Sequence, residues 1–420
     1  MLDRSSASFF SQGRPTLTRY AHHGVPTRVS TVRPRDALLF GLEPGFANLN
    51  HGALGSVPRP VAQACERLST QVEANPDRFM WFTYWPALDE VRASVAELIG
   101  ARPDECVFVP NVSHGVSTVL RNFEWCEGDV VVISVFNTIN GIAHNMSDMP
   151  PHPAVSEFPL HFPDKSKVQR CSKNKIVVVM DSVLPTPAVL MPGRDGGDMQ
   201  GGRRMEPRDA AHSIGQEMNL DLTKAAPDFW ISSCSKWLYA KRACAVLYVP
   251  KRDPTGLNYQ RMKLTQTRTL VDTFKWPGTS DMLTPLSIKS ALPSGPSWGR
   301  REINAYCHHL ALAGGRRMAE ILGTSMLYSA KDEEEYNLNM VNVELPIPSA
   351  IHMSWELMVA FQDKLINEHN TYSTQFYHNN KWWTRPCAQV FNELEDFERL
   401  GKALVVVCKE ITEKFGERQD

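Results

Sequence analysis

The stretch "DFWISSCSKWLYAKRACAVLYVP", residues 228–250, joins two short apolar runs through a polar segment that carries Lys236. The runs "DFWISS" and "ACAVLYV" have the length and composition of buried strands. Similar runs lie upstream at "CVFV", "DVVVISVF" and "KIVVVMD", and a helical segment from about 115 to 122 follows the first of these. Strands that alternate with helices predict an α/β fold with a mainly parallel central sheet.

Several segments outside this region show apolar residues at helical spacing. After residue 298 the pattern is mainly helical, with one expected strand at "LNMVNVEL". The expected helices are 61–72, 88–99, the segment "INAYCHHLALAGGRRMAEILG", 355–368 and 394–415. We therefore expect a large domain over 34–297, which includes an N-terminal loop, and a smaller α+β domain over 298–420.

The first 33 residues are rich in arginine, serine and threonine, and Asp3 is their single acid. This composition is typical of a disordered extension or of a mitochondrial targeting segment. The nine cysteines include no C-x-x-C pair, so neither a disulfide framework nor a zinc ribbon is indicated. A reducing compartment follows, and we expect the cytoplasm, with mitochondria as the alternative.

Charge and hydropathy narrow the class of ligand. Of the 420 residues, 45 are lysine or arginine and 46 are aspartate or glutamate, so the net charge is -1. This balance gives no electrostatic reason to expect nucleic acid or an anionic membrane as partner. The apolar runs are far shorter than the roughly 20 residues of a membrane-spanning helix. We expect a small-molecule ligand.

Two charged residues indicate a specific chemistry. Lys236 alone would be interpreted as a solvated surface charge, but Asp209 precedes it in "DAAHSIG". A carboxylate at the end of a strand can pair with the protonated ring nitrogen of pyridoxal phosphate, while a lysine holds the aldehyde as a Schiff base. Together the two residues favour pyridoxal-phosphate chemistry.

A phosphate group also needs a binding site. In "PNVSHGVSTVL", residues 110–120, Ser113 and His114 stand at an expected helix start, where backbone N–H groups and the helix dipole favour an anion. An ordinary serine N-cap is the alternative. Ser233 and Ser235, beside the lysine, offer hydroxyl donors to the same anion.

An ordered series of motifs resembles the class V aminotransferase family of fold-type I pyridoxal-phosphate enzymes. Within that family the chain is similar to the branch of isopenicillin-N-epimerase-like proteins and fungal ergothioneine-pathway cysteine-sulfoxide lyases. The motifs are "NLNHGALG", "PNVSHGV", "VVVISVFNTI", "VVVMDSVLPTPAVLMP", "DAAHSIGQ", "SSCSKWLYAKRACAVLYVP", "WPGTSD" and "WWTRPCAQVFNE".

The resemblance implies a set of cofactor contacts. Lys236 matches the Schiff-base lysine, Asp209 the partner of the ring nitrogen, and His212 the histidine beside the ring, and these three are the predicted catalytic residues. The further predicted cofactor-binding residues are Ser113, His114, Asp181, Ser233, Ser235, Gly278 and Thr279. The last two match a segment that a neighbouring subunit donates, which implies a homodimer with shared active sites.

The resemblance also implies substrate contacts. Arg385 in "WWTRPCAQV" matches the arginine that binds the substrate carboxylate, and a guanidinium suits this role because it can bond both oxygens at once. A surface ion pair is the alternative for Arg385. Asn50 and His51 in "NLNHG" would lie on the substrate side of the cofactor, with a loop cap as their alternative.

The segment "GRDGGDMQGGRRMEPR", residues 193–208, breaks the α/β pattern because it is rich in glycine and nearly free of apolar residues. It stands where a crossover helix and a strand are expected. A surface loop, a shifted reading frame or a mis-spliced exon would each produce such a segment. We expect no apolar strand leading into Asp209.

We predict from the resemblance a carbon–sulfur lyase that acts on a cysteine-derived sulfoxide. An aminotransferase and an amino-acid epimerase are alternatives, because proton removal at the α-carbon is common to all three reactions. An inactive homologue damaged at 193–208 is an alternative of another class. A metal enzyme is disfavoured, because the chain has no H-E-x-x-H or comparable ligand spacing.

Overall fold

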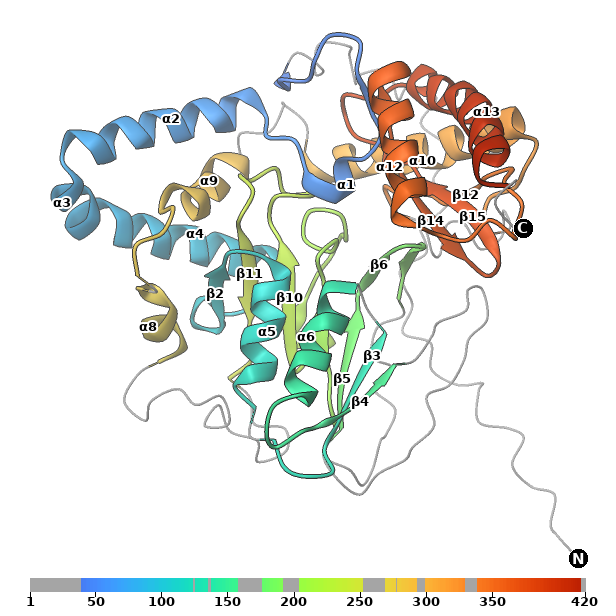
Figure 1. Ribbon diagram of the computed structural model, residues 1–420. Coiled ribbons are helices and arrows are strands. Elements are labelled where there is room, and N and C mark those ends of the chain that lie inside the picture. Colours follow the sequence, from blue (N-terminus) through green and yellow to red (C-terminus); the bar gives the residue numbers. More distant parts are fainter. Residues whose placement is uncertain are drawn as a thin grey trace, which may run out of the picture.

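The computed structural model describes most of the chain, and a central sheet forms its body (Figure 1). The predicted extension 1–33 and the glycine-rich stretch up to residue 203 lie outside the described residues. The described residues are 39–123, 125–134, 137–157, 176–191, 204–251, 269–276, 278–292, 299–328 and 338–416.

The body of the protein is an eight-stranded sheet with the order β2-β11-β10-β9-β5-β3-β4, and β8 pairs with β5 beside β9. Strand β11 is antiparallel to both neighbours, and the other pairs are parallel. The predicted mainly parallel α/β fold is therefore confirmed. The strands are β2 Cys106–Val109, β3 Val130–Ser134, β4 Ala154–Glu157, β5 Ile176–Asp181, β8 Arg204–Met205, β9 Pro207–Asp209, β10 Phe229–Ser233 and β11 Ala245–Tyr248.

The expectation that no strand leads into Asp209 is wrong. Strand β9 lies between β5 and β10, where Asp209 pairs with Asp181 on one side and with Ile231 on the other. Few of its residues are apolar, yet Pro207 is buried and the Arg208 side chain forms an ion pair with Glu206. A short central strand takes its order from backbone hydrogen bonds to two neighbours, so it does not need the apolar run that sequence analysis looks for.

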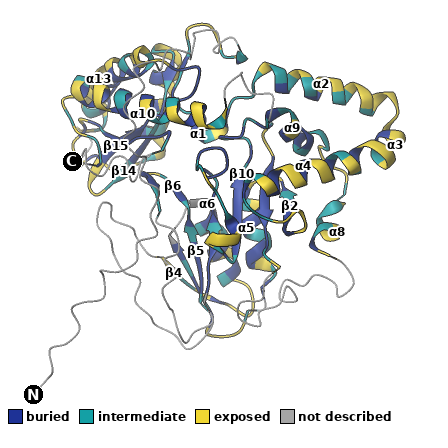
Figure 2. Cartoon of the chain, turned by 180° about the vertical axis from the view of Figure 1, so that it is seen from behind, coloured by how far each residue is buried: buried dark blue, intermediate teal, exposed yellow. Residues whose placement is uncertain are grey.

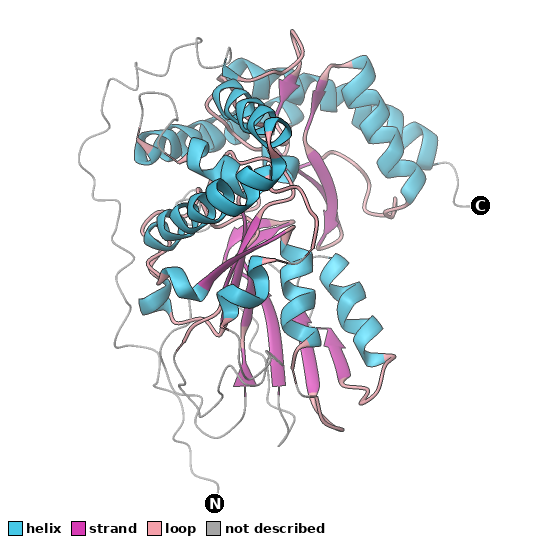
Figure 3. Cartoon of the chain, turned by 90° about the vertical axis from the view of Figure 1, so that its left-hand side faces the viewer, coloured by secondary structure: helices cyan, strands magenta, loops and turns pink. Residues whose placement is uncertain are grey.

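Helices cover both faces of the sheet (Figure 3). In β10, Phe229 and Ile231 pack in one core cluster with α5, whereas Trp230 packs in another with α4. Side chains alternate between the two faces of a strand, so both sets are buried and the strand reads as a continuous apolar run. The helices of this part are α1 His51–Leu54, α2 Arg59–Ala74, α3 Pro76–Arg78, η2 Phe79–Tyr84, α4 Trp85–Leu98, η3 Pro103–Glu105, α5 Val112–Arg121, α6 Asn137–Ser147, α7 Leu222–Ala225, α8 Leu270–Lys275 and α9 Leu283–Ala291.

The C-terminal unit has its own core. Helix α10, Arg300–Leu322, packs along α13, Leu394–Gly416, and Phe40 and Leu49 from the start of the described chain join this core. The helices predicted over 355–368 and 394–415 are confirmed. The remaining elements are α12 Trp355–Asp363, η5 Lys364–Glu368, the sheet β12 Val343–Glu344, β15 Lys381–Arg385 and β14 Thr374–His378, and the pair β1 Ala47–Asn48 with β13 Thr371–Tyr372.

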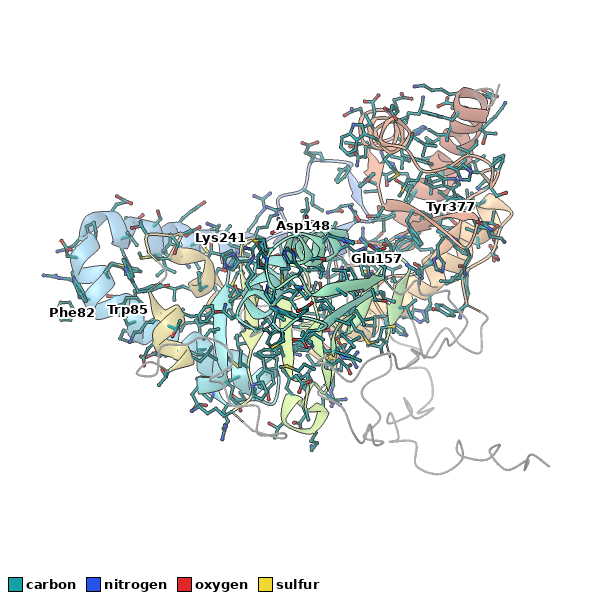
Figure 4. All side chains as sticks on the ribbon, turned by 60° about the horizontal axis from the view of Figure 1, so that its bottom comes forward. Phe82, Trp85, Asp148, Glu157, Lys241 and Tyr377 are labelled. Atoms are coloured by element: carbon teal, nitrogen blue, oxygen red, sulfur yellow. The ribbon has the colours of Figure 1, made fainter. Side chains whose placement is uncertain are left out.

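The helical arm and the C-terminal unit lie at opposite ends of the molecule. Phe82 and Trp85 mark the end of the helical arm formed by α2, α3, η2 and α4, and Tyr377 marks the C-terminal unit at the opposite end (Figure 4). Figure 2 shows that the outer side of the arm is exposed, whereas the strands of the sheet are buried.

No described helix is both long and apolar enough to cross a membrane. The predicted domain boundary at residue 297 stays a prediction.

Candidate active site

The carboxyl edge of the central sheet gathers the predicted catalytic residues. Asp181 ends β5, Asp209 ends β9, and Lys236 follows the end of β10. Asp181 and Asp209 are partners in the strand register. His212 follows Asp209 in the turn that leaves β9, and its ring reaches the lysine. In open α/β sheets ligands bind at this edge, because loops rather than strands continue beyond it.

Lys236 and His212 are in direct contact. The Lys236 Nζ atom lies 2.9 Å from His212 Nε2, and the indole Nε1 of Trp237 donates to His212 Nδ1 at 3.3 Å. An indole nitrogen can only donate, so Nδ1 must be the acceptor and the proton of a neutral imidazole stands on Nε2. Nε2–H then donates to the lone pair of the amine. This arrangement favours the unprotonated, nucleophilic form of Lys236.

Burial is the main cause of the pKa shifts of both residues. Burial lowers the pKa of Lys236 to about 8; the carboxylate of Asp209 opposes this shift and the Arg385 cation adds to it. Burial also holds the pKa of His212 well below its ordinary value, with Lys236 as the next cause. The imidazole is therefore neutral, and the amine loses its proton at a pH more than two units lower than an exposed lysine does.

Two buried carboxyl groups face the lysine from adjacent strands. Burial raises the pKa of Asp209, and burial together with the nearby Asp209 charge raises the pKa of Asp181 further. The backbone N–H of Ala211 donates to Asp209 Oδ1 at 3.0 Å, while Asp181 Oδ2 has no hydrogen-bond partner among the described residues. An added cation would stabilise this pair. The protonated ring nitrogen of pyridoxal phosphate fits that requirement.

A candidate phosphate site lies at the start of α5. Asn111, not Ser113, is the N-cap, because its side chain accepts from the backbone N–H of His114 at 2.8 Å. The serine N-cap alternative is therefore wrong, and the helix begins at Val112 rather than near 115. The first two N–H groups of the helix remain available for an anion.

The hydroxyl groups beside the lysine lie on the same edge of the sheet. Val109, which precedes the start of α5, and Ser233 both pair with Ala245 from opposite sides, so β11 alone separates them. Ser233 Oγ lies 3.2 Å from Ser235 Oγ, and both residues are partly exposed. These positions can hold a phosphate; His114 is exposed, whereas Ser113, Ser233 and Ser235 are partly buried.

Two glycines fix the backbone of the lysine loop. Gly55 has a φ of +74°, and a Cβ atom there would lie 1.9 Å from the carbonyl oxygen of Ser235. At Gly215, with a φ of +86°, a Cβ would lie 2.2 Å from the carbonyl oxygen of Trp237. Only glycine allows this approach. The lysine is therefore held from both sides by chain segments distant in sequence.

Arg385 is a buried cation whose contacts are neutral. Its Nη1 donates to the carbonyl of Pro185 at 2.9 Å, and Nη2 donates to Asn50 Oδ1 at 3.2 Å and to Thr374 Oγ1 at 3.3 Å. The residue is 3% exposed, its side chain has no carboxylate partner in the described parts of the chain, and Nε has no hydrogen bond there. The surface ion-pair alternative is therefore wrong. A buried guanidinium without a counter-ion is suited to receive an anionic ligand.

The structure separates the two residues of the "NLNHG" loop. Asn50 accepts a hydrogen bond from Arg385 and another from Thr374 Oγ1 at 2.7 Å, so it belongs to the group of residues that hold the guanidinium. The His51 ring is buried among Trp237 and two further aromatic rings, with centroid distances of 5.6 to 5.8 Å. Burial lowers the pKa of His51 to about 4, so this imidazole is neutral.

Gly278 and Thr279 lie between α8 and α9. Thr279 is exposed, Gly278 has a φ of +105°, and a Cβ at Gly278 would meet nothing within 4 Å. Neither residue makes a recorded hydrogen bond to the lysine cluster within the described chain. Donation of these residues to a neighbouring subunit stays a prediction.

Three further residues contribute to the site and were not predicted from the sequence. Trp237 orients His212, while Thr374 and the carbonyl of Pro185 hold Arg385. Trp237 directly follows the lysine, and this position next to Lys236 is the feature of the sequence that could have indicated its role. Thr374 lies in a β14–β15 hairpin that was not predicted, and Pro185 acts through its backbone, which no side-chain motif reports.

The chain is similar in sequence to known proteins. No protein-family model matches it. It is 30% identical to the L-cysteine desulfhydrase-like protein lolT1 of Epichloe uncinata, with 89% of this chain and 95% of that protein covered. It is 27% identical to the hercynylcysteine sulfoxide lyase of Schizosaccharomyces pombe, with 88% and 96% covered.

Solved structures share the fold. The structure of the cystine C–S lyase C-DES in complex with its reaction product cysteine persulfide matches with a TM-score of 0.68 at 15% identity. The match covers 86% of this chain and 98% of that one. An apo cysteine desulfurase from Thermococcus onnurineus matches with a TM-score of 0.63 at 16% identity and covers 90% of this chain and 98% of its own. At such low identity the likeness shows the fold alone.

Proposed function

Since the chain belongs to the class V aminotransferase family, together with the L-cysteine desulfhydrase-like proteins, we propose that it is a pyridoxal-phosphate-dependent carbon–sulfur lyase acting on a cysteine derivative. The observation that carries the proposal is that buried charges of both signs act on Lys236: the carboxylates of Asp209 and Asp181, and the cation of Arg385. The carboxylates suit a cationic ring, and the guanidinium suits a carboxylate.

The chain's residues fit the cofactor. Asp209 would hold the ring nitrogen, Lys236 the aldehyde carbon, and the start of α5 with Ser233 and Ser235 the phosphate. When bound, pyridoxal phosphate supplies an electron sink for negative charge at the substrate α-carbon. Asp209 sustains that sink, because a buried carboxylate favours the protonated ring nitrogen.

The other residues position the substrate and move its protons. Arg385 would bind the α-carboxylate through Nε, which has no partner among the described residues, while Pro185 and Asn50 keep the guanidinium in place. The Lys236 amine, whose pKa burial lowers to about 8, would accept the proton from the α-carbon, and mildly alkaline pH favours its unprotonated form. His212 contacts the same amine at 2.9 Å and orients it.

The reaction balances without a further oxidant or reductant. The α-proton leaves to Lys236, the bond between Cβ and sulfur breaks, and its electron pair leaves with the sulfur. A cysteine sulfoxide then yields a sulfenic acid and 2-aminoacrylate. Water converts 2-aminoacrylate into pyruvate and ammonia.

Two substrate classes are compatible with the relatives. The name of the Epichloe protein refers to L-cysteine, and that of the Schizosaccharomyces protein refers to a cysteine sulfoxide. We favour a sulfoxide, because the motifs of the chain resemble those of the fungal cysteine-sulfoxide lyases, and the Schizosaccharomyces relative is named for such a substrate. We further propose a homodimer in which Gly278 and Thr279 of each chain serve the other active site, and a location in the cytoplasm.

The test combines spectroscopy with product analysis. Purified protein is mixed with pyridoxal phosphate, and its absorption spectrum is recorded before and after borohydride reduction, beside the Lys236→Ala variant. We expect a bound-cofactor band that borohydride removes in the wild type and that is absent from the variant. Pyruvate and ammonia are then assayed with S-methyl-L-cysteine sulfoxide and with L-cysteine.

Each outcome selects a function. Pyruvate formed from the sulfoxide supports the proposed lyase. Exchange of the α-hydrogen with solvent deuterium without pyruvate would favour an epimerase, and amino transfer to a 2-oxo acid an aminotransferase. Absence of the band in the wild type would contradict the proposal and favour an inactive homologue.

A further inference from the structure

The hairpin that follows Asp181 carries one of the Arg385 contacts. It consists of β6, Val183–Pro185, and β7, Ala188–Leu190, and its register places Pro185 opposite Ala188 at the tip. The Pro185 carbonyl accepts from Arg385 Nη1. The position of this tip therefore affects where the guanidinium lies.

The other residue of the tip is held by Asn342. The backbone N–H of Ala188 donates to Asn342 Oδ1 at 2.8 Å, and Asn342 Nδ2 donates to the carbonyl of Ala188 at 2.9 Å. The oxygen and the nitrogen of the Asn342 side-chain amide thus both bond the backbone of Ala188. Asn342 is 1% exposed, so water cannot replace these bonds.

Asn342 and Arg385 are themselves neighbours. Val343 pairs with Thr384 in the β12–β15 register, and Met340 pairs with Cys387 in an isolated bridge. The same antiparallel register places Asn342 opposite Arg385. Two cross-strand neighbours of the C-terminal unit therefore bind the two facing residues of the hairpin tip.

Packing leaves the hairpin few alternative positions. One of its faces, with Val183 and Ala188, packs on Trp237, Met340 and Cys387. The other face, with Leu184 and Val189, packs on Tyr328. Apolar packing resists displacement across the hairpin but has no directional preference along it. The two Asn342 hydrogen bonds supply that direction.

We propose that Asn342 is a positioning residue for the substrate carboxylate, acting on Arg385 through the tip of the β6–β7 hairpin. This inference rests on the proposed function for its substrate. Loss of the amide releases Ala188, the Pro185 carbonyl moves, and Arg385 loses the contact that orients Nη1. The amide does not contact the lysine or either aspartate, so catalysis after binding is retained.

The kinetic test is a double-mutant cycle in the holoenzyme with S-methyl-L-cysteine sulfoxide. Asn342→Ala is expected to raise KM about tenfold, with kcat within about threefold of the wild type. In an Arg385→Lys background the same change is expected to have little further effect, because the two residues act on one contact. The carboxamide of the same amino acid should be insensitive to Asn342→Ala.

Asn339→Ala is the matched control. Asn339 is also a buried asparagine of this segment, but its side chain donates to Asn304 Oδ1 at 2.8 Å and does not reach the hairpin. We expect it to lower stability without a selective rise of KM. If Asn342→Ala does not fold, Asn342→Asp, which keeps an acceptor for the Ala188 N–H and lacks the donor to its carbonyl, is expected to raise KM by a smaller factor.

A structural readout keeps the test independent of activity. A crystal structure of Asn342→Ala is expected to show Arg385 detached from the Pro185 carbonyl. An unmoved guanidinium, an unchanged KM in an active enzyme, or full additivity with Arg385→Lys would each overturn the inference. A wild type that cleaves no amino acid would instead contradict the proposed function, and the crystal structure would still decide this inference.

Discussion

The lysine side and the arginine side of the active site are built in different ways. Asp181, Asp209 and Lys236 lie at the ends of neighbouring strands of one sheet, so a single set of backbone hydrogen bonds sets their spacing. Arg385 instead meets Asn50 and Pro185, which come from distant parts of the chain. The lysine side depends on the register of one sheet, and the arginine side on how several segments pack.

The lysine side and the arginine side also differ in charge. Near the lysine, charges of both signs are buried together and shift each other's pKa. Around Arg385 the recorded partners are neutral oxygen atoms. The comparison indicates that the lysine side carries charges of both signs for a bound ring, while the arginine side, as far as the described residues show, keeps one cation without a counter-ion for the substrate.

Lys236→Ala should give the largest effect, because it removes the amine that contacts His212 and that would hold the cofactor. We expect kcat/KM for the sulfoxide to fall by about 10⁴-fold or more. Pyruvate release measures this, and thermal unfolding checks that the variant is folded. A variant that retains a tenth of the activity would remove Lys236 from its proposed role.

Arg385→Leu should act on the arginine side alone. Loss of the cation is expected to lower kcat/KM by about 10²- to 10³-fold, mainly through KM, since the carboxylate loses a charge-assisted bond. The affinity for pyridoxal phosphate, measured by titration of the absorption band, should change less than threefold. An equal loss of cofactor affinity would show that the two sides are not separable.

Gly55→Ala should disturb the lysine side through the backbone. The new Cβ would clash with the Ser235 carbonyl, so we expect the free energy of unfolding to fall by about 3 kcal/mol or more. Gly323→Ala is the matched control: its φ is also positive at +65°, but a Cβ there meets nothing within 4 Å. Its expected cost is about 1 kcal/mol. Urea unfolding of both variants checks the difference, and similar costs would mean that the contact with Ser235 is not tight.

Trp237→Phe should give the smallest effect, on pH dependence. Without the indole donor, His212 can move its proton to Nδ1 and accept from the lysine ammonium, which stabilises the protonated amine. The pKa of Lys236 should therefore rise above about 8. In cofactor-free protein the rate of pyridoxal-phosphate capture rises as the amine loses its proton, so its midpoint should move upward by about 0.5 to 1 pH unit. An unchanged midpoint would contradict the assigned tautomer.

Much of the lysine side could be predicted from the sequence. Strands β2, β3, β5, β10 and β11 coincide with apolar runs, because strands buried on both faces need such residues. Strand β9 escaped prediction for the opposite reason, since its pairing with β5 and β10 replaces the apolar signal. The roles of Asp209 and Lys236 could be proposed because charged side chains at the ends of buried strands are chemically conspicuous.

What the sequence determined by itself is the set of reactive groups and the sheet that carries them: the amine of Lys236, the carboxylate of Asp209 and the guanidinium of Arg385. Local patterning encodes these, since strand periodicity and side-chain chemistry are properties of short segments. Only the tertiary structure decided that Trp237 orients His212, that Pro185 and Asn50 hold Arg385, and that Asn342 bonds the hairpin tip. These are contacts between segments distant in sequence, several of them through backbone atoms, and packing of the whole chain sets their geometry.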